Sequence, residues 1–356
     1  MKVSIGTKIQ EGPWGGGNLF AINLRDYLIK EGHKVVTNLN DDDIDIILIT
    51  EPRKSSESSA YTHFDVKRYI DYVNPEALVV HRINECDERK NTNYVNRYLI
   101  SVNKIADQTV FVSNWLKDLY EDQGINKANN NVIMAGANST IFNNKDFKPW
   151  DGKGKIKIVT HHWGANWNKG FDSYVLVDKL MSQKKWKEKI EFTYIGNLPK
   201  KFSFENSSVV APLSGEALAK EIKKSHLYIT GSLNEPSGNH HIEAAQCGLP
   251  LLYINSGGIP EYCKNFGIMY DVHNLEISLE EIINKYEKYI SGLKSYPFNS
   301  EKMSKNYLSL FKDSILNKDK ILESRPSVPT NLLIYKKIYK LVRKFRSFFL
   351  RINNFF

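Results

Sequence analysis

Short apolar runs alternate with segments of helical periodicity along the first part of the chain. Residues 2–7 have the composition of a strand, glycines follow at positions 15–17, and the apolar residues after them keep a 3.6-residue spacing until Gly32. Residues 44–50 form an apolar run short enough for a buried parallel strand. The alternation continues with predicted strands at 77–81 and 109–113 and predicted helices at 91–106 and 114–124. Strands that alternate with helices indicate βαβ units around a parallel sheet.

A second series of the same kind begins near residue 155. Its predicted strands and helices are 155–160, 171–181, 190–196, 215–224, 227–230, 239–247 and 251–255. Before it, at residues 142–155, the periodicity lapses into Asn, Lys, Asp, Pro and Gly, a composition typical of a linker. We therefore predict an α/β protein of two doubly wound domains, residues 1–148 and 149–298, that face one another.

The chain ends in a predicted helix and a basic tail. Residues 299–325 hold a helix predicted at 300–322, with Met303, Tyr307, Leu310, Phe311 and Ile315 on one side. The tail at 326–356 has prolines at 326 and 329, which separate its basic part from the helix, and that part has the amphipathic pattern of a helix that lies in a membrane interface. Its apolar side is formed by Ile334, Ile338, Leu341, Val342, Phe345, Phe349 and Ile352, and Lys337, Lys340, Lys344 and Arg351 lie away from it.

The net charge of +9 is concentrated at this end of the chain. Residues 324–356 contain eight of the 49 basic residues and no acidic one, which leaves 41 basic against 40 acidic residues elsewhere. A neutral body argues against a nucleic-acid-binding domain. We expect the tail to contact an anionic membrane surface. The alternative is that the tail helix packs on the body of the protein.

Composition and cysteine usage point to a globular protein of the cytoplasm. Hydrophobic residues make up 41% and charged residues 25%, as in ordinary globular domains. No apolar run approaches the roughly 18 residues that span a bilayer, and the N-terminus lacks a secretory apolar core. We expect a cytoplasmic protein, peripheral at the inner face of the membrane through its tail. The three cysteines have no CxxC spacing and are expected to be reduced thiols.

The segment 235–250, Glu-Pro-Ser-Gly-Asn-His-His-Ile-Glu-Ala-Ala-Gln-Cys-Gly-Leu-Pro, has the most specific pattern. Gly238 lets the backbone approach a ligand, and a helix that begins near Asn239 directs free N–H groups and its positive dipole end at an anion such as phosphate. Glu235 lies in the preceding loop and Glu243 one turn inside the helix, so both can accept hydrogen bonds from sugar hydroxyls. Together they suggest a sugar nucleotide.

Polar patterns of this kind also have simpler explanations. Two glutamates eight residues apart, such as Glu235 and Glu243, commonly lie on a solvated face of a helix, and only the flanking Gly and Pro favour a binding site. The histidine pairs 161–162 and 240–241 are unsuited to metal chelation, because adjacent side chains diverge by about 100° on a helix and about 180° on a strand. Residues 41–45 contain a DxD spacing, which can hold a divalent metal, but they precede a strand and predict a solvated turn.

The segment 235–250 resembles the retaining glycosyltransferases of family 4, whose GT-B fold has two Rossmann-like domains with a cleft between them. Their E-x7-E motif is matched by Glu235 and Glu243, and Gly-Gly-Ile-Pro-Glu at 257–261 matches the family's next loop. The resemblance extends to the glycines at 15–17, the strand entry at 32–35, the stretch 106–116 and Lys169-Gly170, and covers residues 1–325.

The resemblance implies how the donor is bound. Glu243 would bind the nucleotide ribose and Glu235 the donor sugar, while Lys169 would neutralise the leaving diphosphate. His81, at the end of its strand, is similar to the family's histidine that faces the transferred sugar, and Glu235, His81 and Lys169 are the expected catalytic residues.

The other expected donor-binding positions are mostly backbone. Gly16 and Gly17 would present N–H groups to the diphosphate from the first domain, opposite Gly238 and Asn239 of the second. The family usually has an arginine shortly before the lysine, and residues 161–169 contain none, so His162 is the expected replacement. Ser237 is a second departure, because an aromatic residue is common there.

The resemblance implies a hexosyltransferase that moves a sugar from a nucleoside-diphosphate donor to a saccharide or lipid-linked acceptor, with retention of configuration, in polysaccharide or glycoconjugate assembly. No cofactor and no metal are expected. Two alternatives stay open: a sugar-nucleotide epimerase of the same fold, which would convert the donor without an acceptor, and a catalytically degenerate protein that binds a sugar nucleotide or a membrane.

Overall fold

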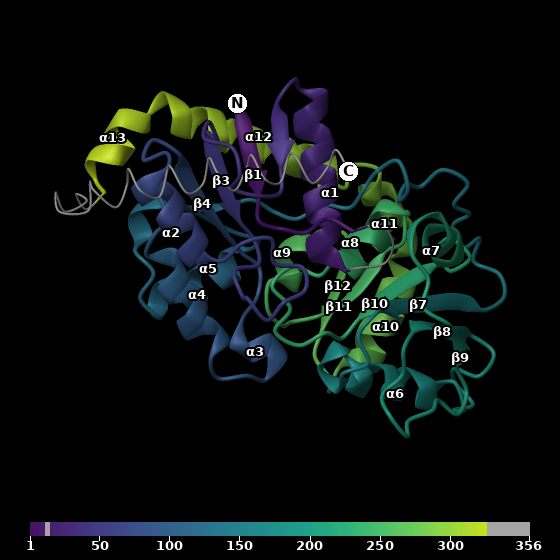
Figure 1. The fold of residues 1–356 in the computed structure, drawn as a ribbon. Helices are drawn as coiled ribbons and strands as arrows, with labels where there is room; N and C mark the ends of the chain where they lie inside the picture. Colours follow the sequence, from purple (N-terminus) through teal and green to yellow (C-terminus); the bar gives the residue numbers. More distant parts are fainter. Residues whose placement is uncertain (11–14, 326–356) are drawn as a thin grey trace, which may run out of the picture.

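A computed structural model describes residues 1–10 and 15–325, and the predicted membrane-binding tail lies outside this part of the chain. Two six-stranded sheets, in which all strands are parallel, form the centres of two domains (Figure 1). The prediction of two doubly wound α/β domains is confirmed. Among these residues, no helix has both the length and the apolar character needed to cross a bilayer.

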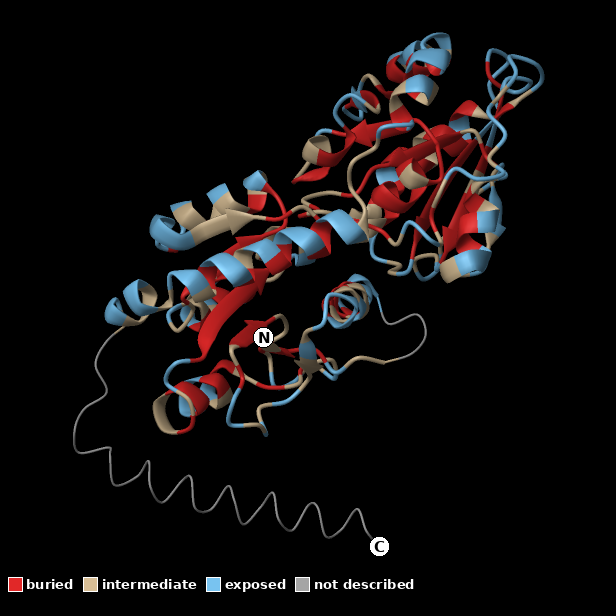
Figure 2. Ribbon diagram, turned by 90° about the horizontal axis from the view of Figure 1, so that it is seen from above, coloured by how far each residue is buried: buried red, intermediate tan, exposed pale blue. Residues whose placement is uncertain are grey.

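The first sheet has the strand order β2-β1-β3-β4-β5-β6, so the order reverses between β1 and β3. Its elements are β1 (Lys2–Ile5), α1 (Gly16–Lys30), β2 (Lys34–Val36), β3 (Ile46–Ile49), α2 (His63–Tyr72), β4 (Leu78–Ile83), α3 (Asp87–Lys90), α4 (Val95–Asn103), β5 (Gln108–Phe111), α5 (Asn114–Asp122), η1 (Lys127–Asn129) and β6 (Asn130–Val132). The apolar runs become central strands because helices cover both faces of the sheet, and β3 is buried along its whole length. Figure 2 shows most of the strands of the two sheets as buried.

The second sheet has the order β12-β11-β10-β7-β8-β9 and reverses between β7 and β10. Its elements are β7 (Ile156–His162), η2 (Trp167–Lys169), α6 (Phe171–Leu180), β8 (Ile190–Gly196), β9 (Ser208–Val210), α7 (Gly215–Ile222), β10 (Leu227–Thr230), α8 (Asn239–Gln246), β11 (Leu251–Ile254), α9 (Ile259–Cys263), β12 (Gly267–Tyr270), α10 (Leu275–Asn284) and α11 (Tyr286–Leu293). Ligands of open α/β sheets bind beyond the carboxyl ends of the strands at such a reversal point.

The last helices return to the first domain. In Figure 1, α12 (Ser300–Leu316) and α13 (Lys318–Glu323) lie over that domain, although they follow the second domain in sequence. Met303, Tyr307 and Phe311 are buried in the core of the first domain, and the Tyr307 ring meets Phe20 of α1 with 5.2 Å between ring centroids. The apolar face predicted for this helix therefore packs on α1.

The two segments that connect the domains run side by side. Ser300 N–H donates to the Ala137 carbonyl at 2.8 Å, and a Cβ on Gly136 would lie 2.2 Å from the backbone of Asn299. This contact requires glycine at position 136. It fixes the segment that leaves the first domain against the segment that re-enters it.

Several element boundaries differ from the prediction. The helix predicted at 300–322 is interrupted at Asn317, whose side chain donates to the Asp313 carbonyl and separates α12 from α13. The helix predicted from residue 91 begins at Val95, because Asn91 adopts a left-handed conformation (φ 54°) that ends the short α3. The prediction also left out α2, although Thr62 and Asp65 form a capping box at its start.

Candidate functional site

The loops after β7 and β10 leave the second sheet on either side of its reversal point. The loop after β7 contains Lys169, and the loop after β10 contains Glu235. The two loops interlock: Leu233 N–H donates to the Asn168 carbonyl at 2.8 Å, and Gly170, at φ 106°, lies so close to Gly231 that a Cβ would come within 2.6 Å of its backbone. This close approach brings Lys169 Nζ to 2.7 Å from Glu235 Oε2, to which it donates a hydrogen bond.

The backbone around Glu235 is fixed by the loop after β11. Gly258 N–H donates to the Glu235 carbonyl at 2.9 Å, and a Cβ on Gly257, at φ 62°, would lie 2.5 Å from the same oxygen. Three residues after Glu235, Gly238 (φ 69°) precedes α8, whose first turn has no side-chain cap. The free N–H groups of this turn and its dipole make the start of α8 suited to an anion.

The first domain brings a second uncapped helix start to the same place. Helix α1 begins at Gly16 without a side-chain cap, and a Cβ on Gly16 would lie 3.0 Å from Asn239 Nδ2 at the start of α8. Nothing lies within 4 Å of a Cβ on Gly17. The structure therefore brings Gly16, one of the two glycines expected to bind diphosphate, next to Asn239 across the domain boundary.

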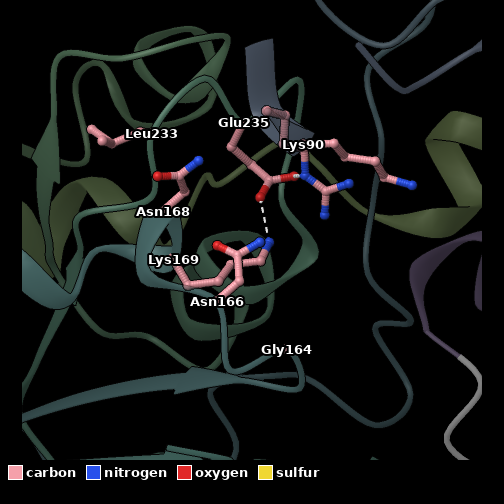
Figure 3. A pocket seen from close by; sticks show the side chains of 8 residues that line it. Lys90, Gly164, Asn166, Asn168, Lys169, Leu233 and Glu235 are labelled. Atoms are coloured by element: carbon pink, nitrogen blue, oxygen red, sulfur yellow. Dashed lines mark hydrogen bonds and ion pairs between the residues drawn. The ribbon is translucent and has the colours of Figure 1, made fainter. Parts of the chain in front are cut away.

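Helix α3, which follows β4 of the first domain, adds two cations. Arg89 Nε lies 2.9 Å from Glu235 Oε1, and Lys90 Nζ lies 2.7 Å from Glu85 Oε2. A cavity of about 210 Å³ opens between the domains here (Figure 3). It is lined by Arg89, Lys90, Gly164, Asn166, Asn168, Lys169, Leu233 and Glu235. Figure 3 shows the Glu235 carboxylate directed at Lys169 and Asn166 directed into the same space.

The charges in this cavity depend on one another. Burial acts to raise the pKa of Glu235, which is only 5% exposed, but Arg89 and Lys169 outweigh it and hold that pKa well below its ordinary value. Burial lowers the pKa of Lys169, and the Glu235 carboxylate opposes this shift. Glu235 is the main cause that raises the pKa of Arg89. One carboxylate is thus ionised between a cation from each domain.

Glu243 lies in α8 but outside this ion-pair network. Its Oε2 is 2.9 Å from His161 Nε2, and His161 Nδ1 is 3.2 Å from the Tyr228 hydroxyl. Both Glu243 and His161 are buried. His161, at the carboxyl end of β7, orients the carboxylate that is expected to bind ribose, a function that sequence analysis did not assign to it.

The side chains of two predicted site residues, His81 and His162, are buried away from the cavity. His81 is fully buried in the first domain, with Nδ1 2.9 Å from Asn103 Oδ1 of α4, and burial lowers its pKa to about 4. The ring of His162 faces α6, with Nε2 2.6 Å from the Tyr174 hydroxyl, and burial holds its pKa well below the ordinary value. A neutral, inward-facing ring does not supply the positive charge expected of His162 beside the diphosphate. The buried position of His81 likewise does not support its expected role of facing the transferred sugar.

Arg89 was not identified from the sequence. It lies in a run of charged residues, Asp87-Glu88-Arg89-Lys90, that is typical of a solvated turn. The available signal was its position shortly after a buried strand, where α/β proteins bind ligands. The acidic turn at 41–45 lies at the opposite, amino end of the first sheet, where Lys2 Nζ pairs with Asp41 at 3.0 Å and with Asp43.

Comparisons with known proteins match part of the chain to a known family. Residues 179–317 match the family described as "Glycosyl transferases group 1", a region that includes Glu235 and Glu243. The chain is 26% identical over 211 residues to the "Phosphatidylinositol N-acetylglucosaminyltransferase GPI3 subunit" of Saccharomyces cerevisiae. That match covers 54% of this chain and 45% of the relative, so the chain spans about half the length of the curated protein it matches.

Solved structures share the fold over most of the chain. Sucrose-phosphate synthase from Thermosynechococcus elongatus has a TM-score of 0.59 at 14% identity, with 88% of this chain and 99% of that chain covered. Anabaena Alr3699/HepE in complex with UDP-glucose has a TM-score of 0.64 at 11% identity, with 88% and 100% covered. These likenesses show the GT-B fold that the sequence resemblance implied.

Proposed function

We propose that the protein is a glycosyltransferase that moves a sugar from a nucleoside-diphosphate donor to an acceptor bound mainly by the first domain. The observation that carries this proposal is the cleft itself: Lys169, Glu235 and the uncapped start of α8 face the uncapped start of α1 across one boundary. Two helix N-termini and a lysine favour a diphosphate, and a carboxylate beside them favours a sugar. The group 1 domain and the UDP-glucose complex of a fold relative support the same assignment.

The chemistry requires charge stabilisation on the leaving group. The bond between the anomeric carbon and the diphosphate oxygen breaks, the diphosphate keeps the electron pair, and the acceptor oxygen bonds to the same carbon while its proton passes to a leaving-group oxygen. Lys169 and the N–H groups of α8 would stabilise the negative charge that develops on the diphosphate. Glu235 would hold the sugar by its hydroxyls, and Glu243, oriented by His161, would hold the ribose.

We assign the finer features by resemblance to family 4. Transfer proceeds with retention of configuration, because the proton acceptor and the leaving group lie on one face of the sugar. The reaction needs no divalent metal and no cofactor, since protein cations and helix N-termini supply the positive potential. Treatment with EDTA should leave the rate unchanged, and abolition with rescue by Mn²⁺ would contradict this assignment.

The acceptor is proposed to be a saccharide or lipid-linked sugar at a membrane surface. The basic amphipathic tail favours this location, and the name of the curated relative includes a phosphatidylinositol acceptor. With such an acceptor, the protein would act in polysaccharide or glycoconjugate assembly at the inner face of the membrane.

Incubation of the purified protein with UDP-, GDP- and ADP-sugars, with and without a membrane lipid extract, tests the activity. We expect release of one nucleoside diphosphate together with a glycosylated lipid or saccharide product, both identified by mass spectrometry. Conversion of the donor to another sugar nucleotide without acceptor would indicate an epimerase instead. No binding and no turnover of any of these donors would contradict the proposal.

A further inference from the structure

Arg89 connects the two domains at the cavity between them. Its Nη1 donates to Glu85 Oε1 of its own domain at 2.7 Å, while its Nε lies 2.9 Å from Glu235 Oε1 of the other domain. The contact to Glu235 is an ion pair without an aligned hydrogen bond, and Nε has no hydrogen-bond partner within residues 1–10 and 15–325. The guanidinium is therefore held in place by its ion pairs, while its Nε–H has no aligned acceptor among the described residues.

The cavity has more cations than its acidic residues neutralise. Arg89, Lys90 and Lys169 line it, and their carboxylate partners are Glu85, shared by Arg89 and Lys90, and Glu235, shared by Arg89 and Lys169. The Arg89 side chain is partly buried, with 24% of its surface exposed, and it shares both of its carboxylate partners. A partly desolvated guanidinium of this kind is suited to bind a further anion that completes its contacts. The start of α8, next to Glu235, adds further positive potential: a Cβ on Gly238 would lie 3.0 Å from Glu235 Cγ.

The second domain supplies one side-chain cation to this cavity, Lys169, because residues 161–169 contain no arginine and His162 faces inward. A diphosphate presents several oxygens, and its charge rises when the bond to the sugar breaks. The planar guanidinium group, with donors in a fork, matches two phosphate oxygens at once, which a single ammonium group does not. Arg89 is placed to add this contact from the opposite wall.

We propose that Arg89 binds the diphosphate of the donor from the first domain, and that the Arg89–Glu235 ion pair holds it in position before the donor arrives. This inference rests on the proposed function. When the donor enters, the Glu235 carboxylate turns to the sugar hydroxyls, and the guanidinium donors of Arg89 turn to the phosphate oxygens. Binding of the donor then requires both domains, so only a closed cleft has its full set of charges.

Calorimetric titration of the full-length protein with UDP and with uridine distinguishes diphosphate binding by Arg89 from a purely structural role of this residue. We expect Arg89→Ala to weaken UDP binding by roughly 10- to 100-fold, the range for a hydrogen bond to a charged group, while uridine binding changes less than about two-fold. Arg89→Lys, which keeps the charge but loses the fork, should lie between wild type and Arg89→Ala. Thermal melts of both variants show whether they are folded.

Glu261 offers a matched control, since it also connects the domains but lies outside the cavity lining. It accepts hydrogen bonds from the Asn114 and Trp115 N–H groups of α5 at 2.8 Å. Glu261→Ala should not reproduce the UDP-selective loss. Three results would show that Arg89 does not bind the diphosphate. They are a UDP-selective loss in Glu261→Ala, wild-type affinity of Arg89→Ala for UDP, and an equal loss of UDP and uridine binding in Arg89→Ala. If wild-type protein binds none of UDP, GDP and ADP, the proposed function fails and this inference fails with it.

Discussion

Gly16 of the first domain lies against Asn239 of the second, so close that a Cβ on Gly16 would be 3.0 Å from Asn239 Nδ2. The two residues begin helices α1 and α8, neither of which has a side-chain cap. The first N–H groups of both helices are thus available to one anion between the domains.

Gly16→Val should therefore weaken UDP binding at least several-fold, because its side chain would displace Asn239 or fill the space of a phosphate. Gly17→Val is the matched substitution, and it should have a smaller effect, since nothing lies within 4 Å of a Cβ there. Calorimetric titration with UDP measures both. Equal affinities for the two variants would show that the close approach at Gly16 does not shape the binding site.

Lys169→Ala should lower kcat by roughly 10²- to 10³-fold, about 3 to 4 kcal/mol, as for loss of one preorganised donor to a developing anion. Lys169→Arg should keep part of the activity because it keeps the charge. Lys157→Ala, at an exposed position near the amino end of β7, the strand that precedes the Lys169 loop, controls for the loss of a lysine. An unchanged kcat in Lys169→Ala would remove this residue from the site.

The paired glutamates should differ in kinetics. Glu235→Ala should mainly lower kcat, because it loses contact with the sugar whose bond breaks, while Lys169 and the start of α8 remain to bind the diphosphate. Glu243→Ala should mainly raise KM for the donor, because it loses the contact to ribose. Steady-state rates at varied donor concentration separate the two effects. Wild-type kcat and KM in both variants would refute the assignment of this motif.

Buried histidines should destabilise the protein in mild acid. The pKa of His81 is lowered from 6.5 to about 4 by burial, so between these values the unfolded chain binds more protons, and stability falls as the pH falls. From pH 7 to 5 this single group should cost about 2 kcal/mol.

Urea unfolding at pH 7 and pH 5 measures the effect. His81→Gln should reduce the loss between these two pH values, whereas His273→Gln, at an exposed position, should leave it unchanged. The same pH dependence in wild type and His81→Gln would show that His81 is not buried in its neutral form.

The basic tail should bind anionic membranes. Arg325 is the last described residue and is held on the first domain, with Nε 2.7 Å from Asp107 Oδ1 and Nη1 2.7 Å from the Pro75 carbonyl oxygen. A chain that ends at Arg325 therefore keeps this contact. Full-length protein should sediment with anionic vesicles at low salt and the shortened chain should not, since basic residues near such a surface contribute about 1 kcal/mol each. Equal sedimentation of the two would contradict the prediction.

The sequence determined those parts of this protein that depend on neighbours along the chain. Apolar runs alternating with helical periodicity predicted both sheets, and the glycines around Glu235 and Lys169 predicted loops at strand ends, because strand, turn and helix start are local properties. Parallel strands bring their carboxyl ends to one edge of a sheet, and the loops that hold Lys169 and Glu235 both follow strands of the second sheet.

Only the tertiary structure decided which side chains meet across the domains. Alternation along β4 places His81 and Arg82 on opposite faces of the sheet, but the sequence does not say which face is covered by helices α2 and α4. The structure places His81 on that face, with its Nδ1 2.9 Å from Asn103 Oδ1. The contact between Arg89 and Glu235 joins residues far apart in sequence and depends on the relative orientation of two domains. No periodicity encodes that orientation, because it is set by packing at the domain boundary and by α12, which returns to the first domain.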